Sequence, residues 1–281
     1  MGSAAMHVIR PVRAGDIDAV ADLADTAGPG MTTLPPDRDI IAKKIERSLE
    51  SFSGQRSGCD AGYLVVLEDL ETSRVVGTAG VYPKVGEACG FYTYRIVDLF
   101  HSSRSQGSRY RIRTLVLSNE LTGSTEVGTL LMHPPAGGTG LGRQLARARY
   151  LFIAQFPHLF GSQVIAEIRG WQDGPGQSPF WKAVGERFFA MPFADADQKS
   201  AVDEAWFIGD LMPRHPLYCC LLSPEAQSAI GRPHRDSATA MKMLLDEGFD
   251  YEGLVDVFDA GPVLTASVHR IAAVSESHMT E

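Results

Sequence analysis

The chain has 281 residues, 44% of them hydrophobic and 21% charged, which is the composition of an ordinary globular protein. Its 26 basic and 34 acidic residues give a net charge of −8, and this argues against a nucleic-acid partner because such partners need a basic surface. No apolar run approaches the roughly 20 residues of a membrane span. The four cysteines show neither a disulfide framework nor metal-ligand spacing. We therefore expect a cytoplasmic protein with no metal site and no membrane partner.

The first third of the chain predicts a strand, two helices and a strand hairpin. Residues 8–12 form a short apolar run. Asp16 is expected to cap the helix that follows, and Pro35 and Pro36 to open a second one. Two further apolar runs, at 63–67 and 75–81, are separated by a short acidic turn. That pattern is typical of antiparallel strands joined directly.

The remainder interleaves strands and helices without the regular rhythm of a doubly wound sheet. Residues 86–118 show no clean period and are interpreted as an insertion carrying some strand. We expect strands at 129–132, 164–168 and 249–258, helices at 143–156, 179–189 and 238–245, and a mixed segment at 193–230. The fold class that follows is mixed α/β, with one twisted, largely antiparallel sheet flanked by helices.

The stretch from Leu130 to Arg143 reads as a strand, a glycine-rich loop and a helix. Glycine allows other atoms to approach the backbone closely, and a helix N-terminus favours anions. The loop lacks the Lys-Ser/Thr ending of a nucleotide-binding P-loop, and it also lacks G-x-G-x-x-G spacing. The pattern predicts a pyrophosphate site, and a plain turn is the alternative.

This stretch resembles the CoA-binding core of GNAT-type acyltransferases, whose loop reads Gln/Arg-x-x-Gly-x-Gly/Ala. Gly140-Leu141-Gly142 matches the end of that pattern, whereas Gly137 stands at its leading position. The segment Ala-Met-Lys-Met-Leu-Leu-Asp-Glu-Gly-Phe at 240–249 is similar to the late helix-to-strand signature of the same fold. The resemblance implies a GNAT-like sheet.

Longer stretches, in order along the chain, resemble the arginine N-succinyltransferase family. Because several multi-residue matches are scattered over residues 8–262, they are more specific than the glycine loop. They include Val-Ile-Arg-Pro-Val at 8–12, Ala-Glu-Ile-Arg-Gly at 166–170, Ser-Pro-Phe-Trp at 178–181, Leu-Met-Pro-Arg-His-Pro at 211–216 and Asp-Val-Phe-Asp-Ala-Gly-Pro at 256–262, with shorter matches at 117–119, 122–124 and 247–249.

The resemblance also predicts the domain organisation. We expect one GNAT-like domain over residues 6–265, with insertions at about 86–118 and 171–236, followed by a tail over 266–281. Family members continue past the Phe-Asp-x-Gly-Pro segment into a small C-terminal β-rich domain, whereas this chain stops at Glu281. The expectation is that this small domain is absent here.

The reaction that the resemblance implies is succinyl transfer from succinyl-CoA to the α-amine of L-arginine, with no permanently bound cofactor. The neutral amine can attack the thioester directly, without a covalent enzyme intermediate. His234 matches the family's proton donor, and an imidazolium can protonate the departing thiolate. The sequence does not identify the base that deprotonates the amine.

The resemblance and the loop together predict the remaining site residues. Backbone N–H groups at Leu130–Met132 are expected to stabilise the oxyanion. Glu167 is expected to hold the substrate amine, and Arg169 to pair with a carboxylate, although an ion pair between these two is the alternative. The predicted CoA-binding residues are Leu130, Leu131, Met132, Gly138, Gly140, Gly142 and Arg143.

Two other functions remain open. One is a GNAT-type enzyme that uses another acyl-CoA or another amine. The other is a non-catalytic subunit that binds CoA or arginine, and either could be a homo- or hetero-oligomer.

Overall fold

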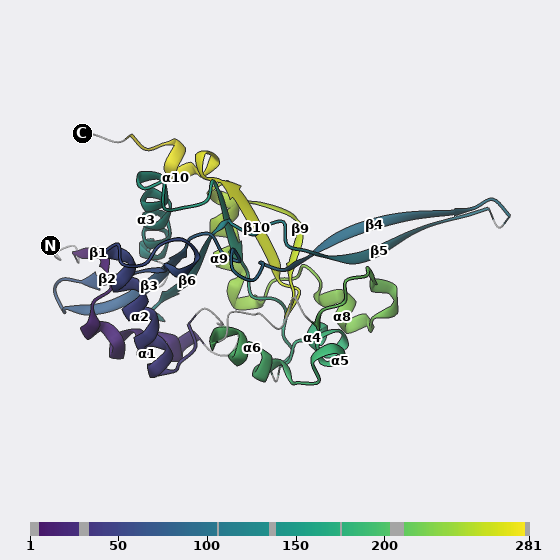
Figure 1. The fold of residues 1–281 in the computed structure, drawn as a ribbon, viewed down its shortest axis with the longest axis horizontal. Helices are drawn as coiled ribbons and strands as arrows, with labels where there is room; N and C mark the ends of the chain where they lie inside the picture. Colours follow the sequence, from purple (N-terminus) through teal and green to yellow (C-terminus); the bar gives the residue numbers. More distant parts are fainter. Residues whose placement is uncertain are drawn as a thin grey trace.

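A computed structural model describes residues 6–27, 34–105, 107–134, 139–174, 176–202 and 211–278. In this part of the chain one ten-stranded sheet has the order β1-β2-β3-β6-β7-β10-β9-β4-β5-β8 (Figure 1). All neighbouring strands are antiparallel except β6 and β7, which are parallel. The strands are β1 (His7–Pro11), β2 (Tyr63–Asp69), β3 (Arg74–Tyr82), β4 (Thr93–Ser103), β5 (Ser108–Ser118), β6 (Thr125–Met132), β7 (Gln163–Glu167), β8 (Leu217–Tyr218), β9 (Asp250–Asp256) and β10 (Pro262–Ser267).

Helices cover both faces of the sheet (Figure 1). On one face α3 (Leu141–Gln155), α9 (Ala238–Asp246) and α10 (Ala272–Ser275) bury apolar side chains in the largest core cluster. On the other, α1 (Ile17–Ala27) packs on β3 and α2 (Arg38–Phe52) packs on β2. Near β9 and β4, α4 (Pro179–Ala183), α5 (Gly185–Phe189), α6 (Phe193–Val202) and α8 (Pro224–Ala229) enclose a separate aromatic cluster. Across the described ranges, no helix is both long and apolar enough to span a bilayer.

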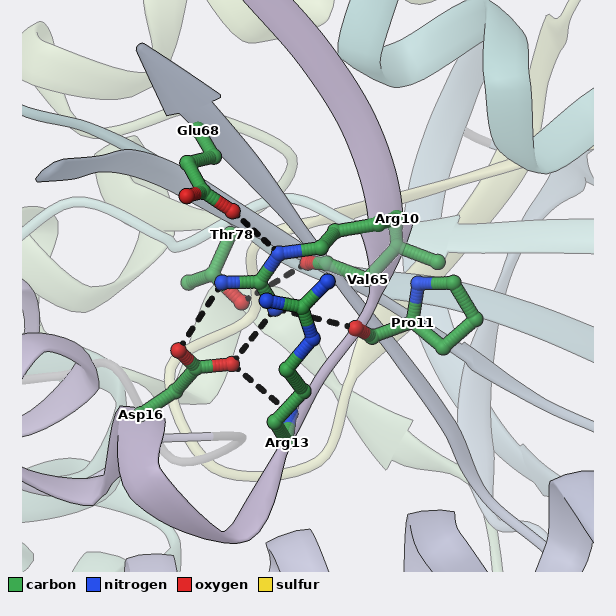
Figure 2. A network of polar contacts seen from close by, with 7 residues as sticks. All are labelled: Arg10, Pro11, Arg13, Asp16, Val65, Glu68 and Thr78. Carbon is green, nitrogen blue, oxygen red and sulfur yellow. Dashed lines mark hydrogen bonds and ion pairs between the residues drawn. The ribbon is translucent and has the colours of Figure 1, made fainter. Parts of the chain in front are cut away.

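The predicted β2–β3 hairpin, α3 and α9 are all observed, each within a few residues of its expected bounds. The role assigned to Asp16 is wrong. Asp16 ends a short 3-10 turn, and its carboxylate accepts hydrogen bonds from the Arg13 backbone N–H at 2.7 Å and from the Arg10 guanidinium at 2.7 and 3.0 Å. Arg10 on β1 also pairs with Glu68 on β2 (Figure 2). Asp16 therefore fastens the first turn to the edge strand instead of capping α1.

Residues 86–118 contain the two longest strands of the sheet. β4 and β5 pair along their whole length, from Thr93 opposite Ser118 to Ser103 opposite Ser108. The base of this hairpin is in the core, where Tyr94 and Leu115 are fully buried. Its outer part projects from the body as a two-stranded arm (Figure 1), on which the Phe100 side chain is 80% exposed. Because the base of the hairpin is buried and the arm is exposed to solvent, this segment has no single hydrophobic periodicity in its sequence.

The last strand, β10, was not predicted. It lies between β7 and β9 and pairs antiparallel with both. It continues to Ser267, and the next turns bury Val268, Ile271 and Ala273 against α3. The main core therefore extends past residue 265.

Candidate active site

The parallel strands β6 and β7 separate soon after they meet. Only Thr125 opposite Val164 and Glu126 opposite Ile165 are paired, although β6 continues to Met132. A cavity of about 460 Å³ lies at this opening. Backbone groups on the separated edges are not engaged in a ladder between β6 and β7, so those without another partner can bind a ligand. The opening places Leu130 and Leu131 on the cavity wall.

A β-bulge changes the direction of the β6 backbone at this point. Thr78 pairs with Leu131 and Gly80 with Gly128, so Thr129 and Leu130 together face Ala79. Thr129 has a positive φ of 56°, and its Oγ1 lies 2.6 Å from the Tyr82 hydroxyl. A non-glycine residue in this conformation costs about 1 kcal/mol or more and is typical of functional sites.

The cavity reaches both faces of the sheet. Its lining includes Ala146, Arg149 and Tyr150 of α3 with Met243 of α9. From the opposite face it includes Thr26 of α1 and Phe193 of α6. Two reactants could therefore meet at the β6 bulge from opposite faces of the sheet.

Gly140 and the first residues of α3 form the described part of the predicted CoA site. Gly140 precedes α3 with a φ of +87°, and a Cβ there would meet nothing within 4 Å. Its carbonyl accepts the Arg143 and Gln144 N–H groups, so Leu141 and Gly142 present the first amides of the helix. Gly138, predicted to belong to this site, lies outside the described residues.

Two other predicted CoA residues have protein partners. The Met132 side chain packs beneath the start of α3, since a Cβ at Gly142 would lie 3.4 Å from Met132 Cγ. The Arg143 guanidinium donates to the Asp246 carboxylate of α9 at 3.0 Å and remains half exposed. To bind a phosphate, the Arg143 guanidinium must therefore either contact Asp246 and the phosphate together or break its ion pair with Asp246.

The structure brings His234 and Arg169 together. A single antiparallel bridge joins Gly170 to Pro233, and the His234 N–H donates to the Arg169 carbonyl at 2.8 Å. Arg169 Nη2 lies 3.2 Å from His234 Nε2. Burial, and then the nearby guanidinium, lower the pKa of His234 below its ordinary value. Arg169 lines the cavity, whereas His234 contacts Arg169 and is not itself among the lining residues.

Glu167 lies in a group of carboxylates that the sequence did not reveal. Glu126 of β6, Asp256 of β9 and Asp259 line the same cavity. Burial first raises the pKa of each of these four groups, and carboxylate neighbours raise the pKa of Glu126, Glu167 and Asp259 further. Both aspartates belong to the matched segment 256–262, and two acids just before Gly-Pro at the end of a strand could have indicated this site.

Arg149 was also missed. It is only 3% exposed, and its Nη1 donates to the Gly128 carbonyl at 3.0 Å, one residue before the bulge. It shares the buried face of α3 with Leu145 and Ile153 at four-residue spacing. A basic residue on the apolar side of an amphipathic helix is the sequence feature that could have identified it.

Gly140→Val tests the predicted CoA loop. A β-branched residue at φ +87° would strain the loop and block close approach of a pyrophosphate. We expect the KM for acyl-CoA to rise by about tenfold, with kcat little changed and the fold intact. Gly123→Val is the matched control, because Gly123 has a φ of +85° and equally open surroundings away from the cavity. Normal CoA affinity of the Gly140 variant in calorimetry would show that the loop assignment is wrong.

The sheet that opens between β6 and β7, with α3 as the next helix after β6, defines a GNAT-like acyltransferase fold, as predicted. Residues 7–273 match the family described as arginine N-succinyltransferase beta subunit. The chain belongs to the arginine N-succinyltransferase family.

Relatives agree with this assignment. An arginine N-succinyltransferase subunit beta from Pseudomonas aeruginosa is 42% identical over 270 residues, which cover 96% of this chain and 79% of the relative. An arginine N-succinyltransferase from Enterobacter sp. (strain 638) is 40% identical, with 98% and 80% covered. The solved structure of arginine/ornithine succinyltransferase subunit AI from Pseudomonas aeruginosa superposes with a TM-score of 0.86 at 31% identity and covers 97% of this chain and 80% of that one.

Proposed function

We propose that this protein transfers the succinyl group of succinyl-CoA to the α-amine of L-arginine. The observation that carries the proposal is the cavity at the β6 bulge, which is lined by Ala146, Arg149 and Tyr150 of α3 and by four carboxylates. An anionic thioester and a cationic amine could meet there. The names and similarity of the relatives support succinyl as the transferred group and arginine as the amine.

In this mechanism Gly140, Gly142 and Arg143 hold the CoA phosphates at the start of α3. The thioester carbonyl lies against β6, where N–H groups of Leu130–Met132 stabilise the oxyanion. The amine attacks from the carboxylate side, and His234 protonates the CoA thiolate as it leaves. Glu167 binds the substrate cation and Arg169 a substrate carboxylate.

A thiol-release assay with purified protein tests the proposal. Succinyl-CoA and acetyl-CoA are each offered with a panel of amines that includes L-arginine. Release of CoA thiol that depends on both succinyl-CoA and L-arginine supports it. Turnover with another pair indicates a different acyltransferase, and binding without turnover in calorimetry indicates a non-catalytic subunit.

Acyl selectivity gives a quantitative expectation. Succinyl-CoA carries a carboxylate that acetyl-CoA lacks, and a site built for that anion is left with an unpaired cation when acetyl-CoA binds. An unpaired buried donor costs about 1–3 kcal/mol, so kcat/KM should favour succinyl-CoA by about tenfold to several-hundredfold. Equal kcat/KM for the two donors would contradict the assignment of succinyl-CoA.

A further inference from the structure

Three carboxyl groups of the cavity lining, those of Glu167, Asp256 and Asp259, influence one another's titration. Burial, and then the neighbouring Asp256 carboxyl, raise the pKa of both Glu167 and Asp259. Like charges in a buried site repel, so a proton on one carboxyl group relieves the others. The group therefore binds protons more readily than isolated carboxylates do.

Backbone N–H groups hold two of these carboxyls in place. Asp259 accepts from Gly170 at 2.6 Å and from Gly261 at 2.8 Å. Asp256 accepts from Phe258 at 2.7 Å and from Asp259 at 2.9 Å, both through Oδ1. Asp256, Asp259 and Glu167 all belong to the cavity lining. The chain thus fixes an acidic surface before any ligand arrives.

Glu126 is a further acidic group of the same cavity. It is 9% exposed and lines the cavity, and no residue in the described ranges donates a hydrogen bond to its carboxyl group. Strand alternation places it on the same face of the sheet as Ile165 and Glu167. Burial raises the pKa of Glu126 to about 7 even though Lys44 of α2 lies nearby. An acceptor that faces a cavity without a protein donor can be satisfied by the N–H groups of a ligand.

Other charged or titratable groups also surround this surface. They are Lys44 and Tyr82 on the α2 side, Arg149 and Tyr150 of α3, and Arg169, His234 and Asp236 at the end of β7. In the described ranges, no group of three or more His, Cys, Asp or Glu side chains has the arrangement of a metal site. A cavity lined by four carboxyl groups fits an organic cation with several N–H donors.

On the basis of the proposed function, we infer that Glu126, Glu167, Asp256 and Asp259 form the subsite for the cationic side chain of the amino-acid substrate, and that this cation displaces protons held by the four carboxyl groups. A guanidinium is always charged and offers five N–H donors in a plane, which suits several carboxylates at once. The displaced protons pass to solvent, leaving ionised carboxylates paired with the cation. At higher pH fewer protons must be displaced, so the cation binds more tightly.

Calorimetry on the wild-type protein, with CoA present at saturation, measures both the preference for a cationic side chain and the number of protons released on binding. L-Arginine is compared with L-citrulline, which has nearly the same shape but an uncharged end group, in buffers of different ionisation enthalpy. We expect release of about one proton per arginine near pH 6.5 and an affinity that rises by up to about tenfold per pH unit between pH 6 and 8. Citrulline should bind at least about tenfold more weakly without proton release. Equal affinities with no proton release for arginine would overturn the inference.

Variants of the carboxylates test whether these groups bind arginine or only stabilise the fold. Asp256→Asn can keep the two backbone hydrogen bonds through its side-chain oxygen while it loses the charge, and Glu126→Gln removes the second acidic group. Each should weaken arginine binding by about tenfold to a hundredfold without lowering Tm, because removal of a buried like charge relieves repulsion. Glu252→Gln, an exposed acid on β9, is the matched control and should leave affinity and Tm unchanged. A lower Tm with unchanged arginine affinity would mean that the carboxylates are structural, against the inference.

The two proposals can fail separately. If arginine binds with proton release but no thiol is released from succinyl-CoA, the proposed reaction is wrong and the cation subsite is upheld. If arginine is succinylated but citrulline binds equally well and no proton is released, the reaction is upheld and the subsite is wrong.

Discussion

His234→Asn is expected to lower kcat by about a hundredfold at neutral pH, with little change in CoA affinity. Asparagine keeps a hydrogen-bonding side chain but cannot deliver a proton in this pH range. General acid–base help contributes about 10²–10⁴-fold, and the CoA thiol is itself a fair leaving group, so the low end applies. Steady-state kinetics with succinyl-CoA and L-arginine gives kcat and KM separately.

The pH profile of the wild type gives the sign of the effect. A proton donor is active while protonated, so kcat should fall as pH rises through the pKa of His234. Burial and the Arg169 guanidinium lower that pKa, which moves this loss of activity to lower pH than for an ordinary histidine. In the variant, this limb of the profile should be absent.

His158→Asn is the matched control, because His158 is exposed and does not belong to the cavity lining. It should retain the wild-type profile. Wild-type kcat for His234→Asn across the whole range would leave His234 as a loop residue that only holds Arg169.

Gly261→Ala is expected to destabilise the protein by about 3 kcal/mol or more. A Cβ at this position would lie 2.1 Å from the Ile168 carbonyl oxygen and 2.6 Å from the Gly170 nitrogen. These neighbours are backbone atoms between β7 and β10, so they cannot move aside as a flexible side chain would, and overpacking of this kind costs at the upper end of about 1–3 kcal/mol or beyond it. Thermal unfolding should show a loss in Tm of about 5–10 °C.

Gly15→Ala is the control for this variant. Gly15 has an ordinary φ, and a Cβ there would meet nothing within 4 Å, so its Tm should stay within about 1–2 °C of the wild type. Because Gly261 also donates to Asp259, any folded Gly261→Ala protein should have lost arginine affinity. An unchanged Tm would mean that β7 and β10 can separate more easily than their backbone contacts indicate.

Local pattern was sufficient for several elements. The acidic turn between two apolar runs predicted β2 and β3, and helical spacing of apolar residues predicted α3 and α9. It was insufficient for the β4–β5 arm, whose base is buried and whose tip is solvated, and for β10, a short apolar strand directly after a turn. In both cases the burial of a residue depends on which strand lies beside it. The hydrophobic periodicity of a short segment does not specify that neighbouring strand.

The sequence by itself determined the fold class, the family and four of the cavity-lining residues, Leu130, Leu131, Glu167 and Arg169, because each lies in a contiguous matched stretch. Only the tertiary structure placed Glu126, Arg149 and Asp256 around the same cavity. These residues come from β6, α3 and β9, which are distant in the chain and meet through the strand order β6-β7-β10-β9. Local periodicity reports which face of an element is buried, whereas the meeting of such faces depends on long-range strand pairing, which is why the acidic surface became visible only in the folded chain.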